Sequence, residues 1–478
     1  MNAPPPNPAQ PPAARSLAAR WQGLSPVRRV FAALGALLSV ILLLCALLIT
    51  IELVAAPAMI HSAGGQNSTQ KAPQETVERG AYLAKVGNCA ACHTARGGEA
   101  FAGGKAIHTP FGAVYTSNIT PDPATGIGRW TNEAFYRAMH EGRSADGRLL
   151  TPAFPYPNYT HVTRADSDAL YAYFMQGVAA VVQPNRVHEL PFPFNTQIAL
   201  AVWRLMFFDK DNLNAPEYIA APAKFQSATA SNRTQNTAEI ERGAYLVRGL
   251  GHCSACHAQR NALGATMGDQ LLSGALMPMQ DWYAPSLLDS AQAGVQRWPA
   301  QDVVALLKTG IAPHASVAGP MAEVVAKSTQ YWSDADLQAT AAYLQSLPEA
   351  PLLARSTPSQ KTQFYERGEQ LFTKHCASCH GAQGEGVVLA GAVALPALAG
   401  NRAVTMPTSA NLVRILLAGG YAPSTAGNPR PFGMPPFVHV LSDEDIAAVT
   451  TYIRAAWGNQ ADAVSAADVV RHRKGLLR

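Results

Sequence analysis

Charged residues and cysteines are scarce in this sequence, and each scarcity excludes a class of protein. Only 14% of the 478 residues are charged and 48% are hydrophobic, so the chain is too apolar for a disordered or acidic protein. The net charge of +5 comes without a long basic run, which argues against nucleic acid as a partner. Seven cysteines are few for a disulfide scaffold of this length. At roughly 100–200 residues per domain, the chain has room for several domains.

Six of the seven cysteines fall in three C-x-x-C-H motifs, which predict covalent attachment of three c-type haems. In such a site the two thiols form thioethers to the haem, and the histidine is the proximal iron ligand. Zinc ribbons need a second C-x-x-C for each site, and a redox pair needs no following histidine, so both alternatives are weaker. The motifs are Cys89/Cys92/His93, Cys253/Cys256/His257 and Cys376/Cys379/His380.

The first seventy residues predict a membrane anchor. Residues 1–29 are rich in proline and alanine and read as a disordered cytoplasmic tail, and residues 30–52 form the apolar anchor. From Val30 to Ile51 the run is uncharged and about 33 Å long as a helix, enough for a bilayer core. Arginines precede it and none follows closely, so we expect the remainder in the periplasm. A cleaved signal peptide is the alternative, but the run exceeds the usual apolar length.

An internal repeat organises the remainder after a linker at 53–72. The block ERGAYLAKVGNCAACH returns as ERGAYLVRGLGHCSACH and, more loosely, as YERGEQLFTKHCASCHG, each read as a helix that leads into the motif. Each unit continues with a helix that ends in glycine and a helix that opens with a capping-box-like pair. We therefore predict an all-α fold of three tandem domains. The expected boundaries are 73–190, 236–350 and 351–458, with a connecting strap at 191–235 and a C-terminal tail at 459–478. The basic end of that tail, RHRKGLLR, is expected to be solvated.

The strap contains the unusually apolar segment PFPFNTQIALAVWRLMFF. Packing between the first two domains is the simpler interpretation. The alternative is a surface for a partner subunit or the membrane interface, which Trp203 and Phe207 would suit.

The order of helices and motif resembles the cytochrome c fold, in which the sixth iron ligand is usually a methionine between the last two helices. That window contains one methionine in the second unit, Met321, and one in the third, Met434. His314 and His439 are the alternatives in these two units.

The first unit has no methionine in the corresponding window, where Phe154 occupies the expected place. The sixth position of its haem is therefore left open between His161, Met139, His140 and a site without a strong protein ligand.

From residue 76 to about 458, the chain resembles the three-haem cytochrome c subunits of bacterial membrane-bound periplasmic dehydrogenases. The group includes subunits of alcohol, gluconate and aldehyde dehydrogenases and of molybdenum hydroxylases. The likeness rests on CAACH with YTSNITPDPATGIGRW, CSACH with VAGPMAEVVAKSTQYW, and CASCHG with FGMPPF. It implies cysteine attachment and proximal histidines in all three units, with Met321 and Met434 as distal ligands.

The resemblance implies an electron-transfer subunit in the inner membrane, single-pass, with its haem domains facing the periplasm. A dehydrogenase large subunit, possibly with a further small subunit, would supply electrons, and ubiquinone or a terminal oxidase would receive them. Dinucleotide, phosphate-loop and zinc-protease motifs are missing, so haem iron is the only redox chemistry predicted in this chain. A free-standing respiratory cytochrome and a haem peroxidase remain alternatives, and the substrate belongs to the partner chain.

Overall fold

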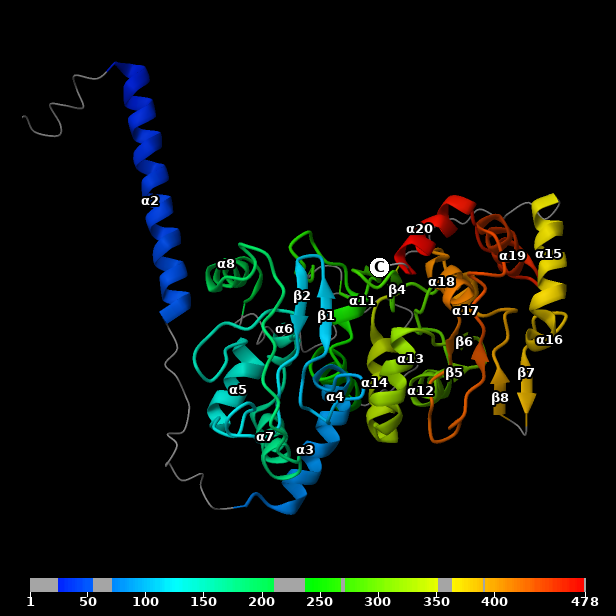
Figure 1. The fold of residues 1–478 in the computed structure, drawn as a ribbon, viewed down its shortest axis with the longest axis horizontal. Helices are drawn as coiled ribbons and strands as arrows, with labels where there is room; N and C mark the ends of the chain where they lie inside the picture. The colour runs from blue at the N-terminus through cyan, green and yellow to red at the C-terminus, as the bar shows by residue number, and fades with distance from the viewer. Residues whose placement is uncertain are drawn as a thin grey trace, which may run out of the picture. The chain divides into compact units, whose positions relative to one another are not determined.

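The computed structural model describes residues 25–54, 71–209, 237–267, 271–350, 363–389 and 392–476. The chain divides into two compact parts, an N-terminal part, Met1–Ala56, and a C-terminal part, Pro57–Arg478. Helix α2 (Pro26–Val54) lies in the N-terminal part and begins four residues before the predicted anchor (Figure 1). At 1.5 Å per residue it extends about 44 Å. It is the one helix among the described residues that is long and apolar enough to cross a membrane.

The two hydroxyl side chains in the uncharged stretch of α2 are compatible with an apolar environment. The Ser39 and Thr50 hydroxyls donate to the carbonyl oxygens of Gly35 and Ala46, at 2.9 and 2.7 Å. Each hydroxyl is therefore satisfied within the helix. Most of the predicted tail and linker on either side of α2 lies outside the described residues.

The C-terminal part is mainly helical, as predicted, but its described residues also form five short antiparallel strand pairs. Strands of two to four residues are too short to show alternation in the sequence, which is why none was expected. The pairs are β1 (Ala106–Thr109) with β2 (Gly112–Tyr115), β3 (Ala275–Met277) with β4 (Trp282–Ala284), β5 (Ile311–Ala312) with β6 (Ala315–Ser316), β7 (Val387–Leu389) with β8 (Ala392–Leu395), and β9 (Gly420–Tyr421) with β10 (Gly433–Met434).

Three long helix pairs form the framework of the described residues of the C-terminal part. In each pair, a helix that leads into a C-x-x-C-H motif packs against the closing helix of the same sequence repeat. The first pair is α3 (Gln74–Val86) with α7 (Arg164–Gln176), the second is α10 (Thr237–Arg248) with α14 (Asp334–Ser346), and the third is α15 (Gln363–His375) with α19 (Asp443–Ala455). Figure 1 labels both helices of the first and third pairs.

Each pair crosses at a buried glycine in its first helix. A Cβ atom there would collide with a backbone carbonyl group of the second helix, so only glycine allows the two backbones to approach this closely. The glycines and the residues whose carbonyls they face are Gly80 with Ala169, Gly243 with Ala339, and Gly368 with Ala448.

An ion pair lies beside each crossing. The arginine immediately before the glycine bonds to an aspartate in the first turn of the closing helix, whose side chain is no more than 16% exposed. These pairs are Arg79 with Asp166, Arg242 with Asp336, and Arg367 with Asp445. The arginine and glycine of the Glu-Arg-Gly tripeptide shared by the three repeats therefore set how the helices cross and pair.

The predicted helix ends are confirmed. The closing helices begin after Thr163, Ser333 and Ser442, whose side-chain oxygens accept the backbone N–H three residues later. The shorter helices end at glycines with positive φ, as a helix C-terminus favours. They are α5 (Asn132–Glu141) before Gly142, α12 (Ala300–Thr309) before Gly310, and α18 (Ala410–Ala418) before Gly419.

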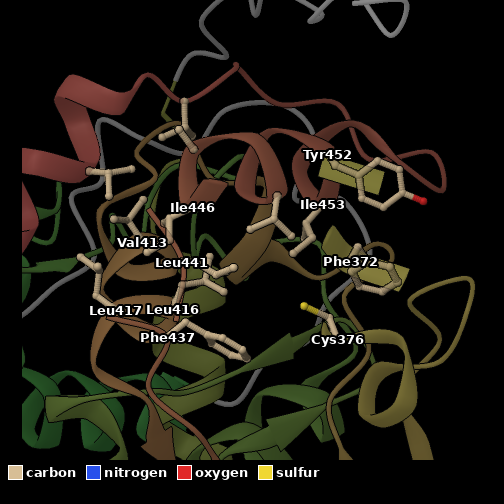
Figure 2. Packing of buried hydrophobic residues seen from close by; sticks show 14 of the residues in the cluster. Phe372, Cys376, Val413, Leu416, Leu417, Phe437, Leu441, Ile446, Tyr452 and Ile453 are labelled. Carbon is tan, nitrogen blue, oxygen red and sulfur yellow. The ribbon is translucent and has the colours of Figure 1, made fainter. Parts of the chain in front are cut away.

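Among the residues that the structure describes, buried apolar side chains form three clusters. The first contains Leu83 and Leu170 together with Leu246 and Trp332, so it is shared between the first two helix pairs. The second lies within the second pair and its neighbours. The third surrounds α18 and α19 and includes Cys376 (Figure 2). Apolar packing therefore joins the first two pairs and encloses the third separately.

The C-terminal tail predicted at 459–478 contains a packed helix. Helix α20 (Ala466–Leu476) packs against α18 and α19, with Val469 fully buried. Arg473, within the basic end that was expected to be solvated, donates to the carbonyl oxygens of Val438 at 2.6 Å and Leu441 at 3.3 Å. The segment is helical because it covers an apolar face that exists only once the third helix pair has folded.

The strap contains helix α8 (Gln197–Phe207). Ala201 and Arg204 are buried, and the Trp203 indole N–H donates to the carbonyl oxygen of Leu263 at 3.0 Å. These contacts agree with the packing interpretation. Ile198 and Met206 are more than half exposed, and the strap residues 210–235 lie outside the described part.

Candidate functional site

The three motifs form short helical turns that directly follow the first helix of each pair: α4 (Cys89–His93), α11 (Ser254–His257) and α16 (Ala377–His380). In the first two, the residue before the first cysteine has left-handed backbone, with φ of 52° at Asn88 and 37° at His252. This sharp turn separates the motif from the long helix and leaves it at the helix pair's end.

Each histidine is held in one orientation by a backbone carbonyl. Its Nδ1 donates to the carbonyl oxygen of a residue one or two positions after a hairpin strand, so the N–H lies on Nδ1 and the lone pair on Nε2. The Nε2 atoms make no hydrogen bond to a residue that the structure describes. The bonds are His93 to Ser117 at 2.7 Å, His257 to Pro285 at 2.7 Å, and His380 to Pro396 at 3.1 Å.

The same hairpins bind the histidine backbone from the other side. A glycine with positive φ, just before the first strand or at the turn before it, donates to each histidine carbonyl oxygen at 2.7 to 2.8 Å. These glycines are Gly103, Gly274 and Gly386. The short strands that the sequence did not reveal therefore position the proposed proximal ligand in every unit.

Burial sets the ionisation of these groups. It raises the pKa of the first thiol in each motif, to about 12 for Cys89 and Cys253 and to about 11 for Cys376. Burial also lowers the pKa of all three histidines, although the carbonyl bonds oppose this. Two thiols beside a neutral imidazole with an available Nε2 are the donor set that covalent haem needs.

The two candidate distal methionines differ in their surroundings. Met434, in β10, packs against the apolar cluster that contains Cys376. Met321 is half-buried in helix α13 (Pro320–Lys327), so the predicted loop of the second unit is partly helical. The alternatives His314 and His439 are both exposed to solvent.

In the first unit the candidate ligands are dispersed. Phe154 packs against Tyr159, with ring centroids 5.3 Å apart, and Met139 is buried in the first apolar cluster. His140 uses its Nε2 in a hydrogen bond to the Val162 carbonyl. His161 faces the second helix pair, since a Cβ on Gly249 would lie 3.6 Å from its own Cβ. Phe154 and Cys89 both pack against the first apolar cluster as well.

The first and second motifs are linked to each other directly. The side chain of Asn158, in helix α6 (Tyr156–Tyr159), donates to the Arg248 carbonyl oxygen at 3.0 Å and the Ser254 hydroxyl at 2.8 Å. In the other direction, the Ser328 hydroxyl donates to the carbonyl oxygen of Val86 at 3.1 Å. Each unit therefore contacts the segment that leads into the other unit's motif.

Lys105 connects the first motif to the helix that carries Met321. Its ammonium donates to the carbonyl oxygen of Ala91, inside the motif, at 2.7 Å and lies 3.5 Å from Glu323 of α13. Helix α13 packs against α4 in agreement with this contact.

Sequence reasoning overlooked the residues that build the crossings and the unit contacts. The signal was available for the arginine and glycine, because Glu-Arg-Gly is common to all three repeats. Tyr82 and Tyr245 recur in only the first two repeats, and nothing in the sequence indicated where their hydroxyls point.

The comparisons with known proteins agree with this geometry. The cytochrome c family model matches residues 77–177 and 365–457. Over 427 residues the chain is 40% identical to the cytochrome c subunit of alcohol dehydrogenase (quinone) from Gluconacetobacter polyoxogenes, covering 85% of this chain and 86% of the relative. This chain belongs to the cytochrome c subunits of dehydrogenases. The family carries covalently bound haem c and transfers electrons.

Two further relatives come from other dehydrogenases. The chain is 38% identical over 415 residues to the gluconate 2-dehydrogenase cytochrome c subunit of Pantoea cypripedii, covering 83% of this chain and 89% of the relative. It is 34% identical over 459 residues to the fructose dehydrogenase cytochrome subunit of Gluconobacter japonicus, covering 90% of this chain and 90% of the relative. Subunits named for different substrates thus share this family's haem-bearing framework.

Proposed function

We propose that this chain is a three-haem electron carrier that receives electrons from a dehydrogenase large subunit. It passes them to ubiquinone or a terminal oxidase. The α2 helix anchors it in the inner membrane, with the haem-bearing C-terminal part in the periplasm, where c-type haem is attached. When bound, each haem accepts and donates one electron, and the protein sets its potential.

The count of three haems is supported by the contacts that each motif histidine repeats, one to a carbonyl oxygen and one to a glycine N–H. The family model leaves the second motif unmatched, yet His257 makes the same carbonyl bond and the same glycine contact as His93 and His380. Each motif would hold one haem by its two cysteines: Cys89 and Cys92, Cys253 and Cys256, and Cys376 and Cys379. The histidines would be the proximal ligands.

Met321 and Met434 would complete the second and third sites. Both are half-buried thioethers, whereas the imidazoles that compete with them are exposed. A methionine at the axial site raises the potential of a c-type haem. With Phe154 in the equivalent place, the first haem would lie at a lower potential than the other two.

Replacing Met434 with leucine tests this assignment. We expect the red charge-transfer band of methionine-ligated ferric haem to weaken and one midpoint potential to fall by on the order of a few tenths of a volt, within the roughly 0.8 V range that axial ligands span. Met406→Leu is the matched control, because Met406 is a buried methionine of the same unit outside the candidate window. Equal spectra and potentials for Met434→Leu and the unmodified chain would contradict the assignment.

Purification from native membranes in mild detergent tests the complex. We expect a dehydrogenase large subunit to copurify and its substrate to reduce the haems of this chain, since the relatives are named as dehydrogenase subunits. The cofactor of that subunit would identify the reaction. Recovery of this chain alone, with no dehydrogenase activity in the fraction, would instead favour a free-standing cytochrome.

A further inference from the structure

Two tyrosines form reciprocal hydrogen bonds between the first and second helix pairs. Tyr82 lies three residues after Arg79 on α3, and its hydroxyl donates to Asp336 of the second pair at 2.5 Å. Tyr245 lies three residues after Arg242 on α10 and donates to Asp166 of the first pair at 2.5 Å. Each tyrosine therefore joins the arginine–aspartate pair of the other unit, in a reciprocal arrangement.

The same hydroxyls also complete the helix caps of the opposite unit. The Tyr82 hydroxyl accepts the backbone N–H of Ser333 at 3.1 Å, and that of Tyr245 accepts the N–H of Thr163 at 3.4 Å. Ser333 and Thr163 are the N-caps of α14 and α7. Each hydroxyl thus satisfies an N–H that would otherwise need a partner at the start of the helix.

The third unit closes its cap internally. The Asp445 carboxylate accepts the backbone N–H of its own N-cap, Ser442, at 3.4 Å and completes a capping box. Gln370 occupies the place of the tyrosines, three residues after Arg367, and it is exposed. The unit therefore retains the arginine–aspartate pair but has no cross-unit tyrosine at this position.

The reciprocal bonds continue into the haem-attachment segments. Asn158 and Ser328 bond across the same interface, to Ser254 and to the carbonyl oxygen of Val86. Leu246 and Trp332 share the apolar cluster of the first pair. The two tyrosines thus lie on an interface that also fixes the first two motifs relative to each other.

We propose that Tyr82 and Tyr245 are positioning residues that hold the first two haems at a fixed spacing, so that these two haems share electrons as a pair. The third haem lies outside the interface that the two tyrosines stabilise. The proposal rests on the proposed three-haem function. Electron tunnelling falls steeply with distance, and charge on one haem shifts the potential of a close neighbour. Fixed spacing therefore determines both the rate of electron exchange and the mutual influence of the two potentials.

The test uses the full-length chain in detergent with both tyrosines replaced, Tyr82→Glu and Tyr245→Glu. Each new carboxylate faces an aspartate across the interface. Repulsion between these like charges should lower the population in which the first two helix pairs are packed together at least about tenfold, equivalent to about 1.4 kcal/mol. Gln370→Glu is the matched control at the equivalent position of the third unit. The conservative pair Tyr82→Phe and Tyr245→Phe removes only the hydroxyls and serves if the charged variant does not fold.

Three measurements separate the outcomes: haem content by intact mass, hydrogen exchange at the starts of α7 and α14, and electron redistribution among the haems after flash reduction. We expect three haems in every protein, faster exchange in the tyrosine variants, and an additional slow redistribution phase with altered potentials. Gln370→Glu should change none of these. Unchanged redistribution and potentials in a three-haem tyrosine variant would overturn the proposal. Fewer than three haems in the unmodified chain would instead contradict the proposed function.

Discussion

Replacing Gly368 with alanine is expected to destabilise the third helix pair by about 3 kcal/mol. An added Cβ would lie 2.8 Å from the carbonyl carbon of Ala448 and closer still to its oxygen, and both belong to the backbone of α19. The helices must therefore separate, which opens the apolar cluster around Phe372. For a unit of about 100 residues, this loss corresponds to roughly 15 °C in its thermal unfolding transition.

Glu369→Ala is the control for this experiment, because the neighbouring residue is exposed on the same helix and its loss should change stability by no more than about 0.5 kcal/mol. Thermal unfolding followed by haem absorption would resolve the transition of the third unit. Since Gly80 and Gly243 occupy the same crossing in the other pairs, alanine there should cost a similar free energy of unfolding. A Gly368→Ala chain that unfolds at the unmodified temperature would show that the crossing can relax.

Replacing both Cys376 and Cys379 with alanine is expected to reduce the covalent haem content from three to two. Both thioether bonds of the third haem would be lost, and the remaining histidine cannot retain it under denaturing conditions. Intact-mass measurement after denaturation would count the haems that stay attached. The equivalent double replacements at Cys89/Cys92 and Cys253/Cys256 should each remove one haem as well.

Cys45→Ala provides the matched control, since Cys45 lies in α2 and belongs to no C-x-x-C-H motif. The control should retain all three haems. A count of two in the unmodified chain, with no change on replacing Cys253 and Cys256, would show that the second motif holds no haem. That result would also explain why the family model matches only the first and third regions.

Local chemistry determined much of this protein from its sequence alone. A C-x-x-C-H motif is complete within five residues, so its three copies could be recognised without knowing the fold. The long apolar helix α2 needs only an apolar run, and helix ends need only a cap or a glycine nearby. These features were predicted because the residues that make them are adjacent in the chain.

The tertiary structure alone decided what depends on distant segments. The hairpin carbonyls that orient His93, His257 and His380 lie 16 to 28 residues away and form strands too short for a sequence pattern. Helix α20 could not be predicted because its apolar partners are on α18 and α19. The hydrogen bonds of Tyr82 and Tyr245 could not be predicted for the same reason, since each hydroxyl bonds to a residue of another repeat. A hydroxyl's partner is set by packing in space, and only the folded chain brings those two surfaces together.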